Sequence, residues 1–298
     1  MPDGSPPFVL RSEAPAKINL TLEVLGKRND GYHDLRSVFQ TLALGDDVSV
    51  TVMPAESGGV SVSVEGPFAA GTPADGTNLA CRAVSELRAI TGGRGDVHIV
   101  LEKRVPPAGG LGGGASDAAT VLRLLQRAWR QATQSDLIEA ANRIGSDEAA
   151  FVLGGTVDIS GRGEVVAQLP NLPAHDVVLF IPRETIPAKT GRMFAAIDQT
   201  PFDDGVVTSG LIERLPAELD GMDIYNAFER VAYDLFPGLP DLWSGLEGRL
   251  NAPVHLAGAG PTLFWLGRAG QGEHVADLAR GIDCTVIATR TADSLWRR

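Results

Sequence analysis

The chain carries five glycines within six residues in the stretch Val105-Pro-Pro-Ala-Gly-Gly-Leu-Gly-Gly-Gly-Ala-Ser-Asp-Ala-Ala119. The β-branched run Val97–Leu101 before it predicts a strand, and the apolar residues after it recur at helical spacing. That spacing predicts a helix from about Ser116 to Trp129, with Ser116 or Asp117 as its N-cap. The stretch is therefore expected to be a loop that joins a strand to a helix.

A glycine loop that opens a helix is a suitable place for phosphate. It exposes backbone N–H groups beside the positive end of the helix dipole, where phosphate oxygens are stabilised. Glycine has no Cβ, so the backbone can approach the phosphate closely and adopt φ angles that other residues avoid. The sequence predicts a phosphate-binding loop, and a tight turn that binds no ligand is the alternative.

Two common nucleotide-binding motifs do not describe this loop. A P-loop needs a lysine after its glycines, and none follows here. The dinucleotide pattern is matched by Gly110-Leu-Gly-Gly-Gly-Ala115. However, the next segment, residues 135–144, is predicted to be helical where a dinucleotide-binding unit needs a strand that ends in an acidic residue.

Composition narrows the class of protein. The chain has 298 residues, a length that allows two domains, and a formal net charge of −11, which argues against binding nucleic acid or membrane surfaces. Its two cysteines, Cys81 and Cys284, form neither a disulfide framework nor a zinc motif. No signal peptide is recognised at the N-terminus, and no apolar run approaches the ~20 residues of a membrane helix. We expect a cytoplasmic protein.

The N-terminal part carries two candidate site features. Residues 14–24 alternate as a strand, which places Lys17 and Asn19 together on one face. An ordinary solvated face is the alternative for this pair. The turn-rich loop that follows ends in Tyr32 and His33, which could offer a flat stacking surface to a base or sugar or could be structural.

Two further features lie later in the chain. Asp147 and Glu148 form a carboxylate pair after the predicted helix of residues 135–144, with a solvated acidic turn as the alternative. Gly258-Ala-Gly-Pro261 is a second glycine loop, between predicted strands at 254–257 and 262–266. A simple hairpin turn is the alternative for this loop, unless it helps to close a ligand pocket.

The remaining pattern mixes strands and helices in both halves, which indicates an α+β protein. We expect two domains, residues 1–170 and residues 171–298, joined near the proline-rich segment 170–175. Further strands are predicted at 48–52, 60–64, 157–159, 164–167, 177–181 and 284–288, and further helices at 77–91, 189–198, 208–215, 224–235, 239–250 and 272–280. Thr77 or Asn78 is expected to cap the first of these helices, and Gly92-Gly93 to end it. The strands at 157–159 and 164–167 are expected to form a hairpin through Gly161-Arg-Gly163.

Together these stretches resemble the GHMP kinases, a superfamily of small-molecule kinases. From Pro106 the glycine loop is similar to the family pattern P-x-x-G-x-L-G-x-x-S-S. The likeness extends over most of the chain through the segments Pro15–Leu20, Asp30–His33, Ile144–Asp147 and Ala257–Thr262. It implies the two-domain GHMP kinase fold, with an N-terminal ATP-binding domain like ribosomal S5 domain 2 and a C-terminal ferredoxin-like domain.

The opening segments are similar to those of GHMP kinases that phosphorylate a cytidylyl-linked sugar alcohol in the non-mevalonate route to isoprenoid precursors. This implies ATP and Mg²⁺ as cofactors and no protein-bound metal site. By matched position, Asp147 is the implied base, Lys17 orients the hydroxyl with Asn19 beside it, and Tyr32 and His33 hold the cytidine, with part of residues 183–194 closing over the base. The implied ATP contacts are Pro106, Gly109, Gly110, Leu111, Gly112, Gly113, Gly114 and Ser116, with Gly258 and Gly260 in the second loop.

The sequence departs from the family pattern at two positions. Ala115 replaces the first of two serines, which removes one hydroxyl, and Ala149 stands where the family usually has proline. Two alternatives stay open: another GHMP kinase that acts on homoserine, mevalonate or a sugar, and a catalytically silent nucleotide-binding protein of the same fold. Tyr32-His33 favours a substrate with a base over the first, and the presence of both Lys17 and Asp147 argues against the second.

Overall fold

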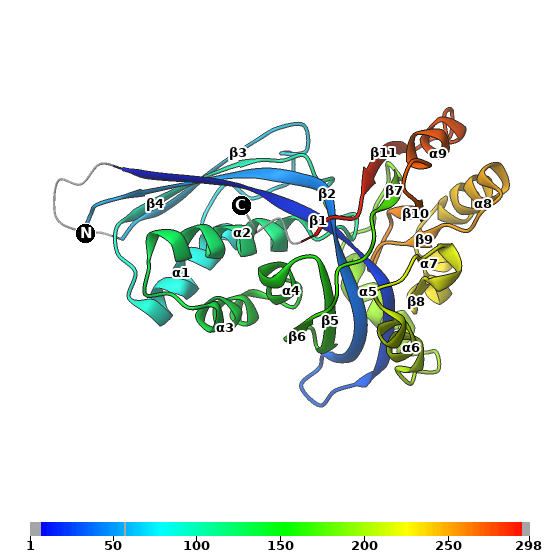
Figure 1. The fold of residues 1–298 in the computed structure, drawn as a ribbon, viewed down its shortest axis with the longest axis horizontal. Coiled ribbons are helices and arrows are strands. Elements are labelled where there is room, and N and C mark those ends of the chain that lie inside the picture. Colours follow the sequence, from blue (N-terminus) through cyan, green and yellow to red (C-terminus); the bar gives the residue numbers. More distant parts are fainter. Residues whose placement is uncertain (1–6, 57, 294–298) are drawn as a thin grey trace. The chain divides into compact units, whose positions relative to one another are not determined.

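The computed structural model describes residues 7–56 and 58–293 (Figure 1). The chain forms two compact units that alternate along the sequence. Unit 1 comprises the residues up to Ala16, Leu44–Pro107 and Gly112–Leu153. Unit 2 comprises Lys17–Ala43, Ala108–Leu111 and the residues from Gly154 onward. Two long neighbouring strands, β1 (Phe8–Lys27) and β2 (His33–Met53), contribute residues to both units.

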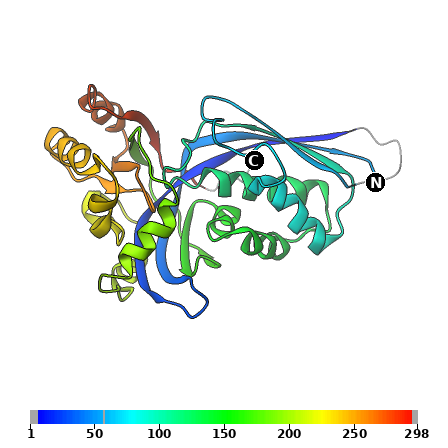
Figure 2. The ribbon, with the colours of Figure 1, turned by 180° about the vertical axis from the view of Figure 1, so that it is seen from behind.

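Unit 1 is a sheet covered by helices. The end of β2 pairs antiparallel with β4 (Asp96–Glu102), which pairs in parallel with β3 (Val60–Glu65). The helices lie on one side of these strands, as Figures 1 and 2 show. They are α1 (Leu79–Thr91), α2 (Gly113–Ala128), α3 (Gln134–Ile144) and the short α4 (Glu148–Leu153). The alternating valines predicted at 48–52 are buried beneath them.

The helix ends in unit 1 follow local chemistry. The side chain of Asn78 accepts from the backbone N–H of Ala80, and Gly92 ends α1 in the left-handed conformation, as predicted. The predicted start of the next helix was wrong, because α2 begins at Gly113 and its N-cap is Gly112. At φ 73°, Gly112 turns the chain into the helix before Ser116, which therefore lies in the first turn.

Unit 2 contains a four-stranded antiparallel sheet in the order β11-β7-β10-β9. Its strands are β7 (His175–Ile181), β9 (His255–Leu256), β10 (Leu263–Arg268) and β11 (Thr285–Arg290). The predicted hairpin is also present, since β5 (Thr156–Gly161) pairs with β6 (Val165–Gln168) and with β2. The helices of this unit are α5 (Lys189–Ile197), α6 (Val206–Arg214), α7 (Glu229–Leu235), α8 (Leu239–Leu250) and α9 (Gly272–Leu278).

The prediction of one helix over residues 224–235 was wrong at its start. Tyr225 and Asn226 form a short strand, β8, that pairs in parallel with Thr21 and Leu22 of β1. The Asn226 amide donates to the carbonyl oxygens of Leu256 and Gly258, both at 2.8 Å, so tertiary contacts override the local helical pattern. The domain boundary at residue 170 stays a prediction.

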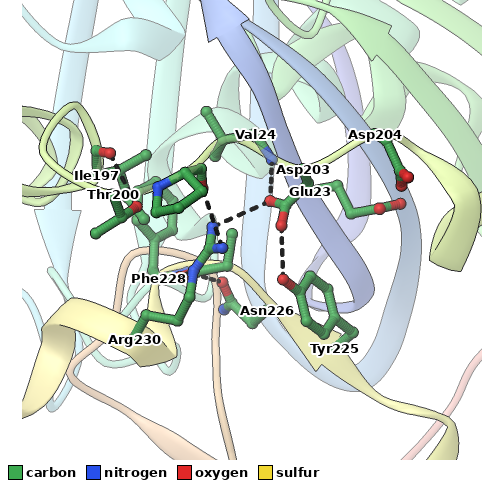
Figure 3. A network of polar contacts seen from close by, with 12 residues as sticks. Glu23, Val24, Ile197, Thr200, Asp203, Asp204, Tyr225, Asn226, Phe228 and Arg230 are labelled. Atoms are coloured by element: carbon green, nitrogen blue, oxygen red, sulfur yellow. Dashed lines mark hydrogen bonds and ion pairs between the residues drawn. The ribbon is translucent and has the colours of Figure 1, made fainter.

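The carboxylates of Glu23 and Asp203 fix the second half of β1 within unit 2, and Figure 3 shows the contacts of Asp203. Asp203 accepts from the backbone N–H of Val24 at 2.9 Å and from the Tyr225 hydroxyl at 2.7 Å. Burial, and then the hydrogen bond to Asp203, raises the pKa of Tyr225 to about 12, so this phenol stays a donor. Glu23 accepts two backbone N–H groups at the start of α6. The strand that carries Lys17 and Asn19 is thus held by several independent contacts.

Candidate functional site

Lys17 and Asn19 form a buried polar pair on β1. Lys17 is 4% exposed, and its Nζ donates to Asn19 Oδ1 at 2.7 Å. The Asn19 amide donates in turn to Ser37 Oγ at 2.8 Å, and Ser37 donates to the carbonyl oxygen of Thr21. The adjacency predicted from the strand period is confirmed, whereas the alternative of a solvated face was wrong. A buried lysine with a fixed partner can present its charge in one direction.

The tip of the first glycine loop contacts both Lys17 and the second glycine loop inside unit 2. The backbone N–H of Lys17 donates to Leu111 O at 3.0 Å, and that of Thr262 donates to Gly109 O at 3.3 Å. A Cβ added at Gly110 would lie 1.9 Å from the carbonyl oxygen of Ala257. A Cβ at Gly258 would lie 3.1 Å from Lys17 Nζ. The second loop is therefore a hairpin turn that also lines the surroundings of Lys17.

The remainder of the first loop leads into α2 in unit 1. The first turn of any α-helix has backbone N–H groups without intrahelical partners, and α2 is 16 residues long. The hydroxyl of Ser116 is buried and has no hydrogen-bond partner among the described residues. A phosphate oxygen or a hydrated cation would satisfy such a hydroxyl, so this end of α2 fits a nucleotide phosphate.

Tyr32 and His33 are adjacent in sequence but lie in different surroundings in unit 2. His33 is buried, with Nε2 2.7 Å from Asp198 Oδ1 and its ring stacked on Phe194 at 4.4 Å between centroids. Tyr32 is 50% exposed, and the guanidinium carbon of Arg162 lies 4.9 Å from its ring centroid. The exposed ring of Tyr32 and the fixed imidazole of His33 could together recognise a base.

Asp147 and Glu148 differ in their environments in unit 1. Asp147 is partly exposed just before α4, and its backbone carbonyl oxygen accepts from the backbone N–H of Phe151 at 3.2 Å. Glu148 is 3% exposed, and its carboxylate lies against Gly145, where an added Cβ would be 2.5 Å from Oε2. Burial, and then the charge of Asp147, raises the pKa of Glu148 to about 7. The pairing of Asp147 with Lys17 stays a prediction.

Comparisons with known proteins identify the family to which this chain belongs. Residues 78–155 match the GHMP kinases N terminal domain. The 4-diphosphocytidyl-2-C-methyl-D-erythritol kinase of Dehalococcoides mccartyi strain 195 is 39% identical over 258 residues, which cover 85% of this chain and 87% of that protein. The chain belongs to the 4-diphosphocytidyl-2-C-methyl-D-erythritol kinase family. The family member of Pelotomaculum thermopropionicum is 35% identical and covers 95% of this chain and 98% of its own length.

Solved structures agree with membership of this kinase family. A crystal structure of 4-(cytidine 5'-diphospho)-2C-methyl-D-erythritol kinase has a TM-score of 0.76 and 31% identity, and covers 95% of this chain and 99% of that one. The mevalonate kinase of Methanococcus jannaschii, at 12% identity and a TM-score of 0.66, covers 98% of this chain and all of its own and shows the shared fold alone. The predicted two-domain α+β GHMP kinase fold is confirmed.

Several residues of this family member's candidate site carry no local signal in the sequence. Phe194 lies within the segment 183–194 that was expected to close over the base, but it was not singled out. Asp198 and Arg162 reach His33 and Tyr32 from distant parts of the chain. A periodic pattern records which face of an element is apolar, and it does not record a partner more than a hundred residues away.

Glu148→Gln should change the pH dependence of stability in this kinase family member. The folded carboxyl has a pKa of about 7, against 4.5 for an ordinary glutamate carboxyl. Between these two pH values the folded state keeps a proton that the unfolded state loses. The protonated carboxyl therefore contributes to the free energy of unfolding below pH 4.5, and this contribution is lost as the pH rises through 7. The loss amounts to about 3 kcal/mol in the native protein. It is absent from the variant, because glutamine does not titrate.

Denaturant unfolding of both proteins at pH 5 and pH 8 measures this effect. Asp117, whose pKa burial also raises to about 7, titrates in both proteins and cancels in the difference between them. Equal pH slopes for the native protein and the variant would contradict the assignment.

Proposed function

We propose that this chain transfers the γ-phosphoryl group of ATP to the 2-hydroxyl of 4-diphosphocytidyl-2-C-methyl-D-erythritol. Family membership at 39% identity supports the reaction. The observation that carries the proposal is the cluster in unit 2 formed by Lys17, the tip of the first glycine loop and the second glycine loop. A buried lysine beside two glycine loops can stabilise an anionic reactant that lies next to an alcohol.

Phosphoryl transfer to an alcohol depends mostly on positioning and on stabilising charge. Lys17 orients the acceptor hydroxyl and neutralises charge, with Asn19 fixing its ammonium group. Asp147 takes the hydroxyl proton, and the amides that open α2 hold the phosphates. General-base assistance contributes about 10²–10⁴-fold to the rate.

Mg²⁺ fits the same proposal. In kinases it binds through one or two protein oxygens together with substrate phosphates, and it neutralises the charge on those phosphates. The Ser116 hydroxyl, buried and without a partner among the described residues, has the chemistry of such a ligand. Because Ala115 stands in place of the first serine of the pattern, Ser116 is the one hydroxyl that this part of the loop offers.

Turnover of ATP with a panel of alcohols tests the reaction. We expect ADP release with 4-diphosphocytidyl-2-C-methyl-D-erythritol and background rates with homoserine, mevalonate and a hexose, with phosphorus NMR locating the new phosphate on the 2-hydroxyl. Faster turnover of any of the other alcohols would assign a different GHMP kinase activity. Absence of turnover with every alcohol would favour a silent nucleotide-binding protein.

Tyr32→Ala should raise the KM for the cytidylyl substrate and leave the KM for ATP nearly unchanged. A base stacked on an aromatic ring contributes about 1–3 kcal/mol in nucleic-acid binders, which corresponds to about 5- to 150-fold. Tyr233→Ala is the matched control, because Tyr233 is similarly exposed on α7. Steady-state kinetics with each substrate varied in turn measure the split. Equal changes in both KM values would assign Tyr32 a structural role.

No helix among the described residues is long and apolar enough to cross a membrane. Both cysteines are free. We retain a cytoplasmic location as part of the proposal, because free cysteines are usual in a reducing compartment.

A further inference from the structure

Three charged side chains form a buried cluster in unit 1 that the proposed reaction does not use. Asp46 comes from β2, Lys103 directly follows β4, and Asp117 lies in the first turns of α2. None of the three is more than 3% exposed. Lys103 Nζ donates to Asp46 Oδ2 and, at 2.5 Å, to Asp117 Oδ2. One ammonium group therefore joins a sheet strand to the helix that the glycine loop opens.

The second oxygen of Asp46 binds the backbone on the other side of the glycine loop. Asp46 Oδ1 accepts from the N–H of Arg104 at 2.5 Å and from the N–H of Val105 at 2.7 Å. Val105 is the last residue before the loop, and Asp117 is the first residue after it. The eleven residues between them, Pro106–Ser116, include all five loop glycines. The cluster therefore holds the chain on both sides of the loop.

We infer that Asp46, Lys103 and Asp117 are positioning residues that fix the separation and direction of the two ends of the nucleotide phosphate loop. The inference rests on the proposed function, in which this loop binds ATP. Glycine-rich backbone loses much conformational freedom when it is ordered. Fixing both ends in advance lowers the entropic cost of ordering the loop when it binds phosphate.

Two considerations favour a geometric role over the alternatives. The cluster has two carboxyl groups and one ammonium group, so even with one carboxyl protonated it offers no net positive charge to attract phosphate. Stability alone does not require it either, because well-packed apolar residues of similar volume often replace a buried ion pair without loss of stability. The feature that apolar residues cannot reproduce is the directed pair of hydrogen bonds from Lys103.

The decisive variant is the double substitution Lys103→Met/Asp117→Leu, which replaces the ion pair by apolar side chains and leaves Asp46 on its two backbone N–H groups. Because the buried Asp46 carboxylate loses its ammonium partner, we expect the thermal unfolding midpoint to fall. We also expect the Kd for ADP, measured by equilibrium titration, to rise at least 10-fold. The KM for ATP should rise by a similar factor, and the KM for the alcohol should stay within about twofold. Such a split is not expected from a purely structural role.

A stability control comes from the same unit. Asp136→Ala removes the side chain that completes the capping box of α3 with Thr133, and should lower the midpoint without changing the Kd for ADP. If the double variant folds and binds ADP as tightly as the native protein, the inference is wrong. If the double variant does not fold, Asp117→Asn, which keeps shape and removes one charge, decides by the same two measurements. No binding of ADP by the native protein would instead refute the proposed function, and the inference with it.

Discussion

Asp147→Asn is expected to lower kcat by about 10²–10⁴-fold while both substrates still bind. Asparagine keeps the size and shape of the side chain but cannot accept the hydroxyl proton. Asp147 is partly exposed and precedes α4, so the substitution should not disturb the buried core of unit 1. Steady-state kcat, together with calorimetric Kd values for ADP and for the alcohol, separates loss of chemistry from loss of binding.

Glu148→Gln is the matched control, because it makes the same chemical change one residue away. The Glu148 carboxylate lies buried against Gly145, so we assign the role of base to Asp147. We expect kcat to change by no more than a few-fold. If Glu148→Gln abolishes turnover and Asp147→Asn does not, the base is misassigned by one residue, and Ala149 in place of the usual proline is the reason to examine first.

The sequence was most informative where the determining interactions are local. The caps of α1 at Asn78 and Gly92, and the β5–β6 hairpin around Gly161 and Gly163, depend on residues a few positions apart, and both were predicted. The spacing of Lys17 and Asn19 along a strand likewise placed their side chains together. Short-range chemistry of this kind leaves a readable pattern.

Prediction failed where long-range contacts determine the structure. The first half of β2, from His33 to about Asp47, was not recognised as a strand, because buried polar residues such as Ser37 and Gln40 interrupt its apolar pattern. β8 was assigned to a helix, since its pairing with β1 joins residues about two hundred positions apart. Both elements owe their conformation to tertiary pairing, which outweighs local preference.

The candidate site shows the same division. The motifs identified the glycine loops and Lys17, because each motif is a contiguous stretch. The contact of Gly110 with Ala257 and the connection of Asp46 to Val105 could not be predicted, because each joins separate stretches. From the sequence, Glu148 was recognised only as one member of a carboxylate pair. Its burial against Gly145, which raises its pKa to about 7, became visible only with the fold.

Gly110→Ala should disrupt the meeting of the two glycine loops. Gly110 has φ 86°, and its Cβ would lie 1.9 Å from Ala257 O and 3.2 Å from Gly260 N. These atoms are backbone, so one loop must move away from the other. A left-handed alanine costs about 1–2 kcal/mol and overpacking about 1–3 kcal/mol more, so we expect a loss of about 2–5 kcal/mol in unfolding free energy. The loop would also leave Lys17, and the KM for ATP should rise by about 100-fold or more, the equivalent of about 3 kcal/mol.

Gly114→Ala is the stability control for this prediction. Gly114 is helical, and the nearest atom to its added Cβ is Leu79 Cδ1 at an ordinary 3.6 Å. Alanine is a better helix former by about 1 kcal/mol, so this variant should be at least as stable as the native protein. Denaturant unfolding and the KM for ATP are measured for both variants. A Gly110→Ala protein with native stability and a native KM for ATP would contradict this prediction. Separating the two loops would then cost neither stability nor nucleotide binding, so their contact would contribute nothing to the binding of ATP.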